Sequence, residues 1–229
     1  MSNIEQLCKE KIVYSFGDSI IAGHTFPLGF VDYACKEKKM NHQKYAINGA
    51  TVIDLRPDRS YILDQIRQAP SVQPDFVVFD GGTNDAFEMM KYSNKQVLKN
   101  GVEKNRSLES QFENSFETLL VFMKEKWPNT QIIYVVPHSI AGLSIDIQEK
   151  MIDFALASCA KHKISVVDIY HDSCLNTHEN NQRVKYSFDT LGDDELPGNN
   201  GSGTHPNLQA IDEFYLPLLR KALRELNTD

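Results

Sequence analysis

Five short hydrophobic runs recur along the chain, separated by longer segments whose hydrophobic positions follow helical spacing. The runs lie at Ile12–Phe16, Tyr45–Ile47, Phe76–Phe79, Ile132–Val136 and Ile164–Ile169. Hydrophobic residues at consecutive positions are typical of strands that are buried on both faces, as in a parallel sheet. We therefore predict five strands at these places, of which Tyr45–Ile47 is the weakest candidate.

The segments between the runs predict helices. One stripe recurs at intervals of three and four residues and stops at Trp127-Pro128-Asn129; its members are Leu108, Phe112, Phe116, Leu119 and Met123. A second stripe runs from Ile147 to Cys159, and a last helix begins near Pro206 with a kink expected at Pro217. Alternating strands and helices predict one α/β domain over residues 1–229, folded as a three-layer α/β/α sandwich.

Composition and charge narrow the possible partners. The chain has 229 residues, 41% hydrophobic and 24% charged, and a net charge of −7, which argues against nucleic acid or an anionic membrane as the main partner. It lacks both a signal peptide and a hydrophobic run of the roughly 20 residues that a membrane helix needs. We expect a soluble cytoplasmic protein without membrane insertion; the oligomeric state is left open.

The four cysteines, Cys8, Cys35, Cys159 and Cys174, show none of the close spacings typical of a zinc site. Cys35 and Cys159 lie in helix-like segments, where a thiol behaves as a small buried hydrophobic group. We therefore expect reduced cysteines and no structural metal.

Ligands of open parallel sheets bind beyond the carboxyl ends of the strands, so the polar residues there are candidates for chemistry. Ser19 follows Gly17 and Asp18 at the end of the first run, where backbone N–H groups of a new helix can face an anion. The alternative is that Asp18 or Ser19 only caps this helix, a role that suits both residue types.

Two more strand-end or loop residues could complete such a site. Asn84 follows Gly82 after the third run, where its neutral amide could donate to a developing oxyanion, although Asn is also common in turns and caps. His205 precedes the last helix and could accept the Ser19 proton and pass it to a leaving group. A histidine in a loop is otherwise a solvated surface residue.

Taken together and in order, four blocks resemble those of the SGNH/GDSL hydrolase family: Gly17-Asp18-Ser19, Asn48-Gly49, Gly82-Thr83-Asn84-Asp85 and Gly203-Thr204-His205-Pro206. The resemblance spans essentially the whole chain. It implies a flavodoxin-like parallel sheet, Ser19 as nucleophile and His205 as base, with neither cofactor nor metal. It also implies an oxyanion hole made by the Ser19 and Gly49 backbone N–H groups and the Asn84 amide.

The chain departs from the family pattern at Ser202. The family usually places an Asp three residues before the histidine, where its charge stabilises the imidazolium ion. Three hypotheses remain: Ser202 or a backbone carbonyl orients His205 in a working dyad; an acid from Asp189, Asp193, Asp194 or Glu195 substitutes; or the protein is catalytically impaired.

Two further histidines and one polar stretch have weaker indications. His138 follows the fourth run, as a substrate contact or as a simple loop residue, and His24 lies close after Ser19. The charged stretch 91–106 is longer than a short connection requires, which indicates a solvated surface insertion.

These features favour a serine esterase that forms an acyl-enzyme on a small acylated substrate. An O-acetyl group on a carbohydrate is the best expectation, from family analogy and from the lack of a long hydrophobic lid segment. The alternatives are a short-chain lipase or thioesterase, or a silent family member that binds a glycan or a protein. Ser202 favours the silent member, and the retained Ser19, Asn84 and His205 favour the enzyme.

Overall fold

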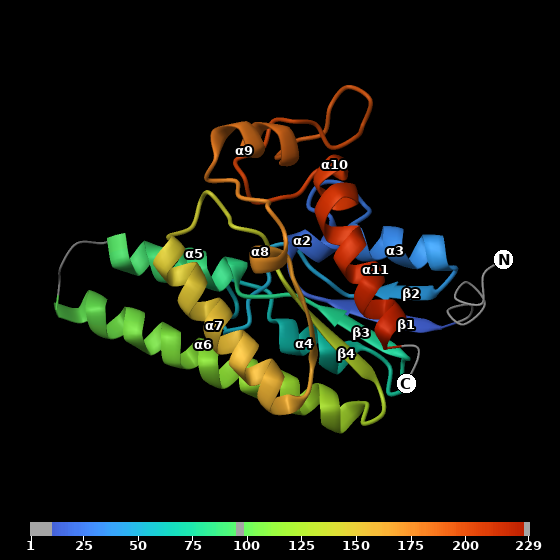
Figure 1. Ribbon diagram of the computed structural model, residues 1–229. Helices are drawn as coiled ribbons and strands as arrows, with labels where there is room; N and C mark the ends of the chain where they lie inside the picture. The colour runs from blue at the N-terminus through green and yellow to red at the C-terminus, as the bar shows by residue number, and fades with distance from the viewer. Residues whose placement is uncertain (1–10, 95–98, 227–229) are drawn as a thin grey trace.

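A parallel five-stranded sheet forms the centre of the computed structural model, which describes residues 11–94 and 99–226 (Figure 1). The strands run in the spatial order β2-β1-β3-β4-β5, the flavodoxin-like order in which the direction of winding reverses beside β1. Their bounds are β1 Ile12–Phe16, β2 Asn41–Lys44, β3 Phe76–Phe79, β4 Gln131–Val136 and β5 Ser165–Asp168. The predicted fold class is confirmed.

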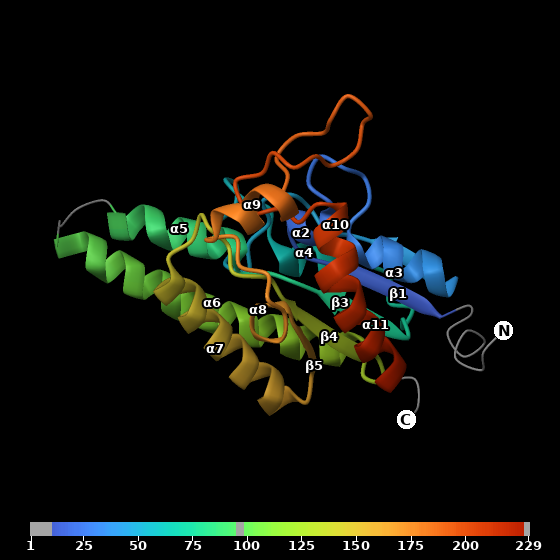
Figure 2. The ribbon, with the colours of Figure 1, turned by 45° about the horizontal axis from the view of Figure 1, so that its top comes forward.

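Helices cover both faces of the sheet. On one face lie α2 (Ser19–Ala22), α3 (Phe30–Lys38) and α11 (Leu216–Glu225) (Figures 1 and 2). The other face carries α4 (Ile62–Gln68), α5 (Thr83–Asn94), α6 (Lys99–Lys126) and α7 (Ile145–His162). The remaining short elements follow β5: α8 (Ile169–Asp172), α9 (Asn180–Tyr186), α10 (Leu208–Ala210) and the π-helical turn η1 (Ile211–Tyr215).

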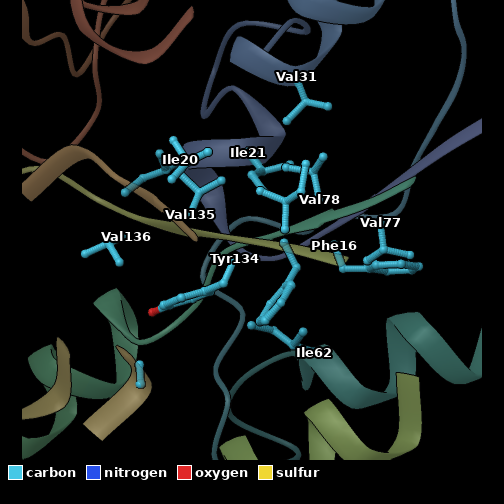
Figure 3. Packing of buried hydrophobic residues seen from close by; sticks show 14 of the residues in the cluster. Phe16, Ile20, Ile21, Val31, Ile62, Val77, Val78, Tyr134, Val135 and Val136 are labelled. Carbon is cyan, nitrogen blue, oxygen red and sulfur yellow. The ribbon is translucent and has the colours of Figure 1, made fainter. Parts of the chain in front are cut away.

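The core fills the space between these layers. Ile20, Ile21 and Val31 pack on one side of the sheet, and Tyr134 and Ile62 on the other (Figure 3). All four residues of β3 are buried, which agrees with the uninterrupted hydrophobic run that predicted this strand. The sheet therefore holds the ends of β1 and β3 at one rigid edge, from which the candidate blocks emerge.

The prediction for the second strand was wrong. The strand is Asn41–Lys44, ahead of Tyr45–Ile47, and its side chains are polar and mostly half-buried. As an edge strand it needs one partner only, and its register is set by backbone pairing with β1. Polar side chains are tolerated there: the His42 ring contacts the Ser15 hydroxyl, and Lys44 forms an ion pair with Asp32.

Other expectations held or shifted slightly. The first and third strands match their predicted bounds, and the fourth and fifth move by one residue at their ends. The stretch 91–106 belongs largely to α5 and α6, apart from residues 95–98, which lie outside the described structure. The π-helical turn η1 lies just ahead of Pro217. Proline has no N–H to donate, and a π turn at this place changes the hydrogen-bond pattern of the helix where that bond is missing.

Cys35 and Cys159 are buried free thiols, as predicted, and Cys174 is an exposed one, whereas Cys8 lies outside the described residues. Among residues 11–94 and 99–226, no helix is both long and hydrophobic enough to span a membrane.

Candidate active site

Ser19 and His205, which are far apart in the sequence, meet at the carboxyl edge of the sheet. The Ser19 Oγ lies 2.9 Å from the His205 Nε2. Ser19 begins α2 directly after β1, and His205 lies in the loop that precedes α10. The hydroxyl and the imidazole are thus within the hydrogen-bond reach that a nucleophile and its base require.

Buried polar groups hold the turn that carries Ser19. Asp18 is the N-cap of α2, accepting a hydrogen bond from the Ile20 N–H at 2.9 Å, so Ser19 is free of that capping role. The Asp80 Oδ1 accepts the Asp18 N–H at 2.9 Å. A Cβ on Gly17 would lie 1.7 Å from the same oxygen, which explains why only glycine fits there.

The second and third blocks come together beside Ser19. The Asn84 Nδ2 donates to the Ala50 carbonyl at 3.0 Å and lies 3.4 Å from the Asp18 Oδ2, a distance that indicates a weak bond. Within the described residues, neither the Ser19 N–H nor the Gly49 N–H has a protein acceptor. These donors are therefore available to a ligand oxygen.

Asp85 fixes the loop of the second block, a role that the sequence did not indicate. Its carboxylate accepts the Val52 N–H at 3.0 Å and the Ile53 N–H at 2.8 Å. Burial raises the pKa of Asp85 to about 7, against these two bonds, which lower it. The carboxylate ties the start of α5, and with it Asn84, to the loop that contains Gly49.

Asp189 is the acid that faces His205. Its Oδ1 lies 3.9 Å from the His205 Nδ1, within ion-pair distance but beyond a hydrogen bond, and that buried nitrogen has no hydrogen-bond partner in the described structure. Ser202 holds both carboxylate oxygens: its N–H donates to Oδ2 at 2.9 Å and its Oγ to Oδ1 at 3.1 Å. Ser202 therefore binds the acid instead of the imidazole.

His138 is a loop residue, as one of the two alternatives held, but it is buried and not solvated. It is fully buried, with its Nε2 2.9 Å from the Gly203 carbonyl and its Nδ1 2.7 Å from the Tyr215 hydroxyl. Since a carbonyl only accepts, the Nε2 carries the proton and the tyrosine hydroxyl donates to Nδ1. Burial lowers the pKa of His138 to about 4, so the neutral ring supports the loop that leads to His205.

His24, which the sequence indicated only weakly from its place close after Ser19, lies against His205. Its ring stacks on the His205 ring with centroids 3.7 Å apart and planes 5° from parallel. Burial, and then His24, lower the pKa of His205 to about 4, whereas Asp189 acts in the opposite direction. His205 is therefore neutral near pH 7, the state in which it can accept a proton.

A small pocket opens at this pair. Its wall contains both Ser19 and His205, and otherwise mostly hydrophobic residues: Ile20, Leu28, Phe188, Pro197 and Ile211. Across the described ranges, no group of three or more His, Cys, Asp or Glu side chains is arranged to hold a metal ion. The arrangement suits nucleophilic attack on a small electrophilic carbon, followed by proton transfer through His205.

The chain is similar to several solved structures over nearly its whole length. A protein from Lactobacillus plantarum aligns with a TM-score of 0.71 and 14% identity, covering 95% of this chain and 98% of that one. Phospholipase A1 from Streptomyces albidoflavus aligns with a TM-score of 0.64 and 14% identity, covering 93% and 99%. A mutant of Axe2, an acetyl-xylooligosaccharide esterase from Geobacillus stearmophilus, gives 0.59 and 17%, covering 96% and 95%.

At these identities, the structural similarity is evidence of a common fold alone. No curated protein matches the chain. The family model of the GDSL-like lipase/acylhydrolase family, however, matches residues 15–210, the span that holds all four blocks. The chain therefore belongs to the GDSL-like lipase/acylhydrolase family of hydrolases.

Proposed function

We propose that this protein is a serine esterase that removes small acyl groups through an acyl-enzyme intermediate. The observation that carries the proposal is the 2.9 Å contact between the Ser19 Oγ and the His205 Nε2. Family membership supports it, because the two residues occupy the first and last of the four blocks.

In the proposed reaction, the Ser19 Oγ attacks the ester carbonyl carbon while its proton passes to the His205 Nε2. The carbonyl π electrons move onto oxygen, and the Ser19 N–H, the Gly49 N–H and the Asn84 amide donate to that oxyanion. Collapse of the intermediate expels the alcohol, which takes the proton from His205. Water then repeats the sequence, releasing the acid and freeing Ser19.

Asp189 serves as the acid of the triad in this proposal. Neutral His205 accepts from Ser19 through Nε2, so its Nδ1 carries the proton and faces the Asp189 Oδ1 at 3.9 Å. An approach of about 1 Å would form the hydrogen bond, and catalytic hydrogen bonds often tighten only when substrate binds. Ser202 then fits the departure from the family pattern: it holds the substitute carboxylate.

The substrate class that we propose is an O-acetyl ester on a carbohydrate. The pocket at Ser19 and His205 is small and mostly hydrophobic, which suits a short acyl group better than a long chain. The structural similarity to an acetyl-xylooligosaccharide esterase supports the carbohydrate part of the proposal.

The proposal is tested by hydrolysis of two substrate sets with the purified protein. We expect kcat/KM to fall as the acyl chain of 4-nitrophenyl esters lengthens from acetyl to octanoyl, and acetate to be released from acetylated xylo-oligosaccharides. A preference for octanoyl over acetyl esters would favour a lipase, and binding of the acetylated sugar without acetate release would favour a silent binder.

Replacement of Asn84 by alanine tests the oxyanion hole. Asn84→Ala should lower kcat by about 10²–10³-fold with little change in KM, because one donor to the transition-state oxyanion is lost. Steady-state kinetics and the thermal unfolding midpoint should be measured together. An effect on KM alone would mean that Asn84 binds substrate but does not stabilise the transition state.

Replacement of Ser202 by aspartate separates a relocated acid from a missing one. Since both oxygens of Asp189 already accept from Ser202, Ser202→Asp would place a second carboxylate against the first. We expect kcat to fall by about tenfold, equivalent to roughly 1.4 kcal/mol of repulsion and lost support. In Ser202→Ala, which keeps the backbone donor, kcat should fall less. A large rise in the kcat of Ser202→Asp would show that the wild-type site lacks a working acid.

A further inference from the structure

The segment after α2 places a histidine in an unusual backbone conformation beside the active site. His24 follows Gly23 and has φ +57°, in the left-handed region that is uncommon for residues other than glycine, although histidine adopts it more often than most. Strained backbone of this kind persists where surrounding contacts hold it, and it is frequent at functional sites. The contacts that hold His24 in this conformation therefore indicate which parts of the site it serves.

His24 contacts three separate parts of the site. Its Nε2 lies 3.0 Å from the Asp189 carbonyl, and its own carbonyl accepts from the Asn48 Nδ2 at 2.9 Å. Its ring lies flat on His205 and meets the Phe188 ring edge-on at 5.6 Å. One residue thus joins the acid loop, the loop that contains Gly49, and the base; Figures 1 and 2 show the segments after α2 and α9 side by side.

His205 needs such support, because its own hydrogen bonds do not fix it. The Ser19 contact holds Nε2, but Nδ1 is 3.9 Å from the acid and has no hydrogen-bond partner in the described structure. One hydrogen bond leaves the ring able to rotate about the line to Ser19. The flat contact with His24 fixes the plane of the ring, and with it the direction in which Nδ1 points toward Asp189.

The hydrogen bond to Asp189 sets the direction of the His24 donor. The Asp189 carbonyl only accepts, so the His24 Nε2 carries a proton and donates it to that carbonyl. The groups that act on His205 are His24, Asp189, His138 and the Ser19 hydroxyl.

We infer that His24 is a positioning residue that aligns His205 with Ser19 and Asp189 by its stacked ring and its Nε2 donor. The inference rests on the proposed esterase function, since alignment matters only if His205 transfers a proton. It assigns no bond-making step to His24.

His24→Gly tests the inference, because glycine suits the left-handed backbone and removes only the ring. We expect kcat to fall on the order of 10²-fold with KM nearly unchanged, as a small misplacement of a catalytic group can cause. The acid limb of the kcat/KM profile should move to higher pH, because the His24 ring no longer helps to bury His205, and burial is the main cause that lowers the pKa of His205. The thermal unfolding midpoint should stay close to that of the wild type.

His24→Phe is the second variant. It keeps a flat ring that covers His205 but loses the donor to Asp189, so we expect a smaller fall in kcat, with KM nearly unchanged and the acid limb close to that of the wild type. This fall in kcat is expected even if His24→Gly does not fold. His171→Phe is the matched control, since His171 is exposed, forms its hydrogen bonds with Asp168 and packs against the Tyr170 ring; it should behave as the wild type.

The outcomes separate this inference from the proposed function. A wild type that hydrolyses acetyl esters, with both His24 variants equal to it in kcat and in pH profile, would overturn the role of His24 and leave the esterase standing. A fall in kcat that is matched by a loss of folding stability in both variants, without a shift of the acid limb in His24→Gly, would also overturn it. A wild type without hydrolysis would overturn both.

Discussion

Replacement of Ser19, the proposed nucleophile, should have the largest effect of any single substitution in this site. Ser19→Ala is expected to lower kcat for acetyl esters on the order of 10⁶-fold, as loss of a serine nucleophile does in a triad that works as a unit. The residual rate would come from the oxyanion donors, which remain in place. Steady-state hydrolysis of 4-nitrophenyl acetate by the wild type and the variant provides the measurement.

The fold should survive this substitution, for reasons that the structure makes specific. Asp18, and not Ser19, caps α2, and alanine is well tolerated at the first position of a helix. Ser173→Ala is a suitable control, since its hydroxyl bonds only near the end of α8, to the Ile169 carbonyl and the Leu175 N–H. A Ser19→Ala variant with the wild-type unfolding midpoint and the wild-type kcat would show that another residue is the nucleophile.

Loss of the Asp189 charge should have the second largest effect. Asp189→Asn is expected to lower kcat by up to about 10⁴-fold, the value for replacing the acid of a serine-protease triad by a neutral isostere. The asparagine oxygen can still accept one of the two Ser202 donors, so much of the loop geometry should persist while the charge is removed. The effect should appear in kcat, because the imidazolium ion forms only as Ser19 attacks.

The neighbouring acids provide the control for this substitution. Asp194 lies in the same loop, where its carboxylate accepts the Leu196 N–H and does not face His205. Asp194→Asn should therefore keep nearly all of the wild-type kcat. Equal activity of Asp189→Asn and the wild type would mean that His205 works in a dyad and that the 3.9 Å ion pair does not contribute to catalysis.

The parts of the fold that could be predicted are those in which burial decides the residue type. The run Phe76–Phe79 became β3 with its bounds unchanged, because a strand buried on both faces admits only hydrophobic residues. The strand Asn41–Lys44 carries no such signal, since an edge strand is selected by backbone pairing with β1. Nothing in the hydrophobic pattern distinguishes it from a loop.

The candidate site also has residues that could be predicted from the sequence and residues that could not. Ser19, Gly49 and Asn84 follow strands, and the carboxyl-end rule together with the family resemblance places them at one rim. His24 and Asp189 come from loops whose closeness depends on tertiary contacts between residues 165 positions apart. His138 is the opposite case: the sequence places it at the rim, but in the structure it is buried and its ring contacts Tyr215 and Gly203.

Covalent labelling tests directly whether Ser19 is the nucleophile. The wild type and Ser19→Ala are treated with a small active-site phosphonate, and the modified peptide is mapped by mass spectrometry. We expect one adduct on Ser19 in the folded wild type, loss of esterase activity in proportion to labelling, and no adduct in the variant. An unlabelled wild type that hydrolyses no ester, or an adduct on a different residue that abolishes activity, would contradict this assignment.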